Sequence, residues 1–195
     1  MINLKRETAE LLAESSKNLA QYVASSSFDF WQRKDFRLFI DFNNISQTEQ
    51  DRIFNELELS IIGLFVLKFE HALLTAKEEQ KIVLSALKKD FGSGFMQLLA
   101  DSGVEKEFID QWDYLIGMRL KEYREDLKIA LKESASWEEL KGDEETRIAW
   151  VRIETITIDC LSHIRRGKVE KDDPLWKLLR KWFITEDARL NPITQ

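Results

Sequence analysis

The sequence predicts an all-α fold, a single-domain antiparallel bundle of about six helices that spans residues 1–195. Only 7 glycines and 2 prolines among 195 residues leave too few turn formers for a β-sandwich or barrel. Apolar residues instead recur three or four positions apart over long stretches, which is the spacing of one face of a helix. The composition, 44% hydrophobic and 33% charged, indicates a folded chain with a well-solvated surface.

The first half of the chain contains two helical patterns separated by an aromatic segment. The first helix is expected from Asn3 to Ala24, and residues 25–45 form an aromatic-rich connector of less regular pattern. The next helix starts at Ser46, which forms a capping box with Glu49. It becomes apolar on most sides after Ser60, so we expect it at the centre of the packing.

The third and fourth helices follow from the same spacing. The third starts near Lys77 and is expected to kink or break at Gly92 and Gly94, because each glycine costs about 1 kcal/mol relative to alanine in a helix. The fourth follows Gly103, and its apolar stripe runs from Trp112 to Ser134. Short links between these segments favour antiparallel neighbours.

Residues 145–167 allow two interpretations. Their β-branched residues are compatible with a strand, but an uninterrupted helical stripe favours a helix. The stripe consists of Ala149, Ile153, Ile156, Cys160 and Ile164. Gly167 is expected to end this helix, and the Asp173-Pro174 pair is expected to begin the last one.

Asp159 and His163 are the candidate metal ligands. They stand four residues apart, so both side chains lie on one helix face and can converge on a transition metal, with a carboxylate such as Glu122 or Glu125 from another helix. The alternative is an ordinary pair on the helix surface. Lys121 and Arg124 stand beside these glutamates, which is typical of a solvated face and weighs against a Mg²⁺-dependent hydrolase.

Arg165, Arg166 and Lys168 form a candidate anion or partner patch in an otherwise acidic chain. Guanidinium groups recognise phosphate and carboxylate bidentately, so nucleic acid or an acidic partner is one interpretation. The other is that these cations complement the end of a helix. A formal net charge of −6 disfavours general nucleic-acid binding.

The aromatic segment from Phe28 to Phe42 also has two interpretations. Rings interleaved with basic residues can stack on bases or enter a membrane interface. An aromatic stripe is more typical of a core, and Asp29, Asp35 and Asp41 weaken attraction to anionic surfaces.

Function is predicted from general physical chemistry, because we find no cofactor-binding motif in the sequence. The leading hypothesis is a non-enzymatic protein-interaction or regulatory protein that self-associates. A metal-dependent or small-ligand-binding bundle enzyme and a nucleic-acid-associated factor are the alternatives. A single cysteine, Cys160, expected to be buried, suits the cytoplasm, and no apolar stretch is long enough to cross a bilayer.

Overall fold

Helices form the whole of the secondary structure in the residues that the computed structural model describes, which are 2–136, 143–170 and 172–194. The predicted all-α bundle is confirmed, with six long helices. These are α1 (Ile2–Trp31), α3 (Gln47–Thr75), α4 (Glu78–Asp101), α5 (Lys106–Ser134), α6 (Glu144–Ile164) and α7 (Pro174–Arg189). Short elements complete the described chain, namely α2 (Lys34–Phe39), a 3₁₀ turn (Phe42–Asn44) and α8 (Asn191–Thr194).

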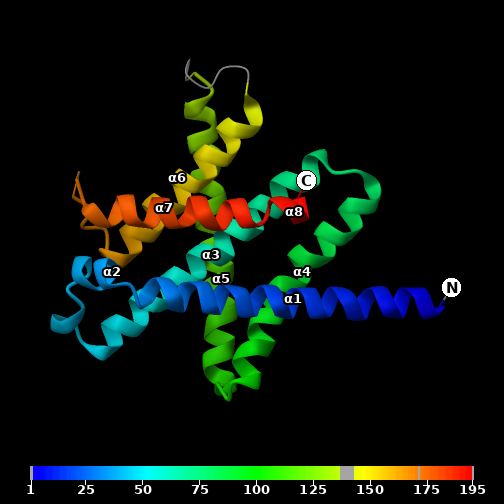
Figure 1. Cartoon of the computed structure of the whole chain (residues 1–195), viewed down its shortest axis with the longest axis horizontal. Helices are drawn as coiled ribbons and strands as arrows, with labels where there is room; N and C mark the ends of the chain where they lie inside the picture. Colours follow the sequence, from blue (N-terminus) through cyan, green and yellow to red (C-terminus); the bar gives the residue numbers. More distant parts are fainter. Residues whose placement is uncertain (1, 137–142, 171, 195) are drawn as a thin grey trace.

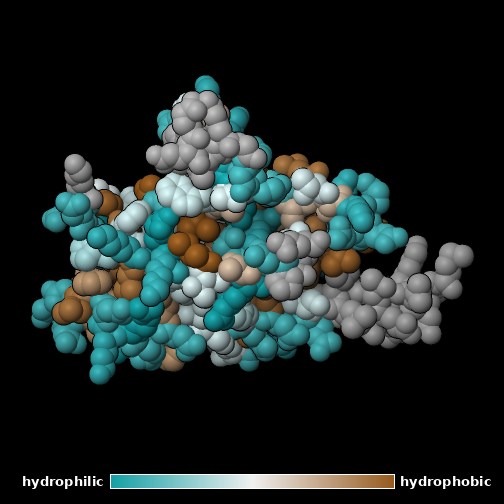
Figure 2. Space-filling model, turned by 45° about the horizontal axis from the view of Figure 1, so that its top comes forward, coloured by the Kyte–Doolittle hydropathy of each residue, from teal (hydrophilic) through white to brown (hydrophobic). Residues whose placement is uncertain are grey.

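The long helices cross in two main directions. In Figure 1, α1 and α7 run roughly parallel to each other, and α5 lies across both. The paired lower ends of α4 and α5 protrude from one side of the molecule (Figure 1). On the face shown in Figure 2, apolar side chains form small separate patches among hydrophilic ones.

The central position of α3 is confirmed. Ser46 caps its first turn, and its side chain accepts a hydrogen bond from the Glu49 backbone N–H at 3.3 Å. Every residue from Glu56 to Phe69 is buried, because all five other long helices pack against α3. One of them approaches very closely: a Cβ on Gly63 would lie 2.4 Å from the ring of Tyr123 in α5, so a glycine is needed there.

The expected break in α4 is wrong, because α4 continues through Gly92 and Gly94 as one helix. The reason is packing against α1. A Cβ on Gly94 would lie 2.9 Å from the Ser16 carbonyl oxygen, so this glycine allows the two backbones to approach. The contact with α1 therefore outweighs the low helix propensity of glycine.

Much of the aromatic segment belongs to the core. Helix α1 continues seven residues beyond Ala24 to Trp31, and α2 follows it directly, so the segment 25–45 is more helical than its pattern indicated. Phe30, Trp31 and Phe36 are buried and contact one another or their neighbours as aromatic pairs. Phe28 is exposed.

The expected boundary between α6 and α7 is confirmed. Gly167 has a φ of +75°, and its N–H donates to the Ser162 carbonyl at 2.8 Å, which closes the end of α6. Helix α7 then starts at Pro174, and the Asp173 side chain accepts from the Leu175 N–H at 2.9 Å. Cys160 on α6 is fully buried, as predicted.

Candidate functional sites

The predicted pair Asp159 and His163 lies where α6 packs against α5. His163 Nε2 is 3.1 Å from Glu122 Oε2, so one of the two carboxylates anticipated from another helix does reach this position. Glu122 also accepts from Arg119 Nη1 at 3.2 Å, and the same guanidinium donates to Glu56 at 2.7 Å. His163 and Glu122 thus belong to a polar contact between helices.

Asp159 is the least satisfied member of this contact. Its Oδ2 atom is buried without a hydrogen-bond partner. Burial, together with the nearby carboxylates of Asp126 and Glu122, raises its pKa to about 7. Burial and the carboxylates of Glu122 and Glu125 also raise the pKa of Asp126. Within the described ranges, no three His, Cys, Asp or Glu side chains are grouped so that they can hold a metal ion.

The predicted basic patch is largely engaged in contacts within the chain. Arg165 donates to Asp173 at 2.7 Å and to the Phe39 carbonyl at 3.0 Å, which joins the end of α6 to α2 and α7. Arg166 forms an ion pair with Glu49 at the start of α3. Lys168 is exposed. Two of the three cations therefore have carboxylate partners, which matches a structural role at the end of α6.

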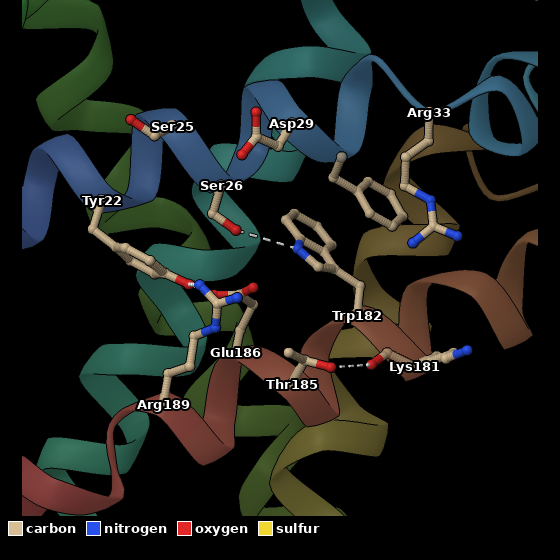
Figure 3. A pocket seen from close by; sticks show the side chains of 11 residues that line it. Tyr22, Ser25, Ser26, Asp29, Arg33, Lys181, Trp182, Thr185, Glu186 and Arg189 are labelled. Atoms are coloured by element: carbon tan, nitrogen blue, oxygen red, sulfur yellow. Dashed lines mark hydrogen bonds between the residues drawn. The ribbon is translucent and has the colours of Figure 1, made fainter.

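A groove of about 290 Å³ lies between α1 and α7 (Figure 3). From α1, Tyr22 and Ser26 point toward α7 (Figure 3). The Tyr22 hydroxyl donates to Glu186 and accepts from Arg189 at 2.6 Å, and the Trp182 indole N–H donates to Ser26 at 3.3 Å. Burial and the Glu186 carboxylate raise the pKa of Tyr22 to about 12, so this hydroxyl keeps its proton. These polar groups satisfy one another across the groove, as expected of a seam between two helices.

The N-terminal half of α5 carries a second, mostly apolar stripe, which we call the α5 face and define as Phe108, Gln111, Tyr114, Leu115 and Met118. Phe108 is 53% exposed, Tyr114 is 72% exposed and Met118 is 39% exposed. Their spacing places them on one side of the helix, away from the buried Ile116 and Tyr123. A shallow trough runs along this face, lined by Tyr114 and Leu115 together with Gln111, Glu107 and Asp110.

The α5 face was not predicted from the sequence, although the spacing of its apolar residues is a signal for it. The helix was predicted from the stripe that begins at Trp112. A second set of apolar residues lies on another side of the same helix and was not considered. Phe108, Leu115 and Met118 repeat at intervals of seven and three, which is the spacing of a helix that packs against another helix.

Comparison with known proteins gives no information on the function of this chain. The chain matches no protein-family model, no curated protein and no solved structure. Among the described residues, no helix combines the length and the apolar character needed to span a bilayer.

Proposed function

We propose that this is a protein-interaction protein that pairs with a second copy of itself through the α5 face. The observation that carries the proposal is the exposure of Phe108, Tyr114 and Met118 on one side of a single helix. Scattered apolar residues are normal on a surface, whereas a contiguous apolar stripe with a polar border is typical of an interaction site.

The arrangement of the α5 face suits a helix as its occupant. Phe108, Gln111, Leu115 and Met118 follow the three-four alternation of positions a and d in a heptad repeat. Side chains in these positions pack into the spaces between residues of a facing helix. The α5 face belongs to the N-terminal half of α5, whose end protrudes from the molecule together with α4 (Figure 1).

Charge favours a second copy in antiparallel orientation. Glu107 and Lys121 lie seven residues on either side of Tyr114, and all three are exposed. A twofold axis near Tyr114 therefore places Glu107 of one copy opposite Lys121 of the other, twice in the interface. Neither side chain forms an ion pair with any described residue of its own chain. The α5 face is thus self-complementary in both apolar and charged positions.

The test is a charge-swap cycle measured by sedimentation equilibrium on the full chain. The wild type should dimerise, and Glu107→Lys and Lys121→Glu should each weaken the dimer by about fivefold, because like charges then face each other. The double variant should recover most of the affinity. The matched control is Glu79→Lys, a reversal at an exposed position of α4 that should leave the dimer unchanged.

Tyr114→Ser tests whether apolar contacts of the α5 face contribute to the affinity of the dimer. Loss of a central aromatic residue should weaken the dimer at least tenfold while leaving helical content unchanged, because Tyr114 is 72% exposed in one chain. A wild type that stays monomeric at about 200 μM would overturn the proposal, as would a double charge swap that fails to restore affinity.

The cytoplasmic location stays a proposal, whereas the nucleic-acid alternative is not proposed. The buried thiol of Cys160 suits a reducing compartment such as the cytoplasm. The nucleic-acid alternative loses its main support, because Arg165 and Arg166 bind Asp173 and Glu49.

A further inference from the structure

A polar pocket of about 310 Å³ lies where α3, α6, α7 and α8 meet, and no residue of the α5 face lines it. Lys68 from α3, Arg152 from α6 and Asp187 from α7 line it, and all three are buried. Residues with hydrogen-bonding side chains complete much of its lining, namely His71, Thr75, Glu145, Thr146, Asn191 and Thr194.

One carboxylate serves two cations in this pocket. Asp187 Oδ1 accepts from Arg152 Nε at 3.0 Å and from Arg152 Nη2 at 2.7 Å, while its Oδ2 accepts from Lys68 Nζ at 2.9 Å. Lys68 also donates to Asn191 Oδ1 at 2.6 Å and to the Asp187 carbonyl. All three ammonium protons of Lys68 are therefore used, but the guanidinium is not fully satisfied.

Arg152 is only 2% exposed, yet its Nη1 atom has no acceptor among the described residues. A buried N–H without an acceptor is costly and rare in folded proteins. Burial lowers the pKa of Lys68, and the neighbouring Arg152 charge lowers it further against the pull of Asp187. The buried group of three carries one more positive than negative charge, and the exposed Glu145 carboxylate lines the same cavity.

We propose that this pocket binds a compact oxyanion, a phosphate or a small carboxylate, whose charge balances Lys68 and Arg152. Thr146 and His71 line the same cavity and supply hydrogen-bonding groups for further oxygens. The net charge of the whole chain is −6, so such binding depends on this local arrangement and not on a general attraction to anions.

Glu145 provides a sharp test, because it lines the pocket and carries a negative charge. Its carboxylate is held by His71 Nε2 at 2.9 Å, and its side chain is 68% exposed. Glu145→Gln removes a charge that repels the ligand without disturbing the core. We expect this variant to bind an oxyanion about threefold more tightly, an effect that added salt reduces.

The experiment is calorimetric titration of the full chain with inorganic phosphate and, separately, with acetate, in chloride buffer of constant ionic strength. Saturable binding of one ion per chain is expected, and the two arms show which oxyanion the pocket prefers. Ala149→Leu places bulk in the pocket lining and should weaken binding at least tenfold. Glu144→Gln is the matched control, because Glu144 neighbours Glu145 but pairs with Arg147 outside the pocket, and affinity should be unchanged.

Two results would overturn the inference. If neither ion gives saturable binding, water alone satisfies Arg152. If binding occurs but is the same in Glu145→Gln, Ala149→Leu and Glu144→Gln, the ion occupies another place.

Discussion

Arg152 and Asp159 lie two turns apart on α6 and have opposite electrostatic surroundings. At Arg152, two buried cations share the carboxylate of Asp187, and a guanidinium nitrogen lacks an acceptor. At Asp159, the carboxylates of Glu122 and Asp126 face a third carboxylate, and a carboxylate oxygen lacks a donor. The turn of α6 around Arg152 is short of negative charge, and the turn around Asp159 is short of positive charge.

The two places show two ways in which a buried ionisable group is accommodated on one helix. Lys68 and Arg152 are deeply buried, and the Asp187 carboxylate pairs with both cations, which offsets part of the cost of burying them. Asp159 is less deeply buried and can lose its charge by keeping a proton. An Asp→Asn substitution should therefore have opposite effects at the two places.

The largest effect is expected from Asp187→Asn. Removal of this carboxylate leaves Lys68 and Arg152 buried without a counter-charge, so the free energy of unfolding should fall by about 3 kcal/mol or more. Urea denaturation monitored by circular dichroism measures the change.

The matched control is Asp101→Asn. Asp101 pairs with Lys17 at 2.9 Å on the surface, where both side chains are more than 40% exposed, so its loss should leave the free energy of unfolding nearly unchanged. Equal effects of the two substitutions would show that the buried group of three contributes no more than a surface pair.

A smaller effect of opposite sign is expected from Asp159→Asn. The folded-state pKa of Asp159, about 7, lies above the value near 3.9 expected in the unfolded chain, so the native state holds the proton more tightly. Its contribution to stability is complete below about pH 4 and is lost as the pH rises through 7. An asparagine side chain cannot ionise, so the variant should match the wild type below about pH 4 and exceed it by about 1 kcal/mol at pH 8, after allowance for solvent screening.

A control for this pH dependence is necessary because burial also raises the pKa of Glu58, to about 8. Glu58 acts in the same direction, but it is present in both proteins and cancels in their difference. If the difference between Asp159→Asn and wild type stays constant from pH 5 to pH 8, Asp159 is already ionised in the folded protein.

The comparison also separates what the sequence can predict from what it cannot. Helical periodicity identifies α6, and the four-residue spacing indicates that Asp159 and His163 share a helix face, which the structure brings close to Glu122 of α5. Periodicity cannot join Lys68 to Asp187, because 119 residues separate them and only the packing of α3 against α7 brings them together. A weaker signal was available, since Lys68 interrupts an apolar run and Arg152 stands between Val151 and Ile153. A charged residue in such a position predicts a buried partner, but not which one.

The smallest effect is expected from His163→Gln, which tests whether the end of α6 is only a contact between helices. His163 contacts Glu122 at 3.1 Å, and the Glu122 side chain is 36% exposed, so the change should lower the free energy of unfolding by less than about 1 kcal/mol. The measurement is urea denaturation at pH 7 with and without added Zn²⁺, because a metal held by the native state would raise stability. We expect Zn²⁺ to have no effect on either protein. A Zn²⁺-dependent increase in the wild type that both His163→Gln and Asp159→Asn abolish would contradict this expectation and establish the metal site that the sequence suggested.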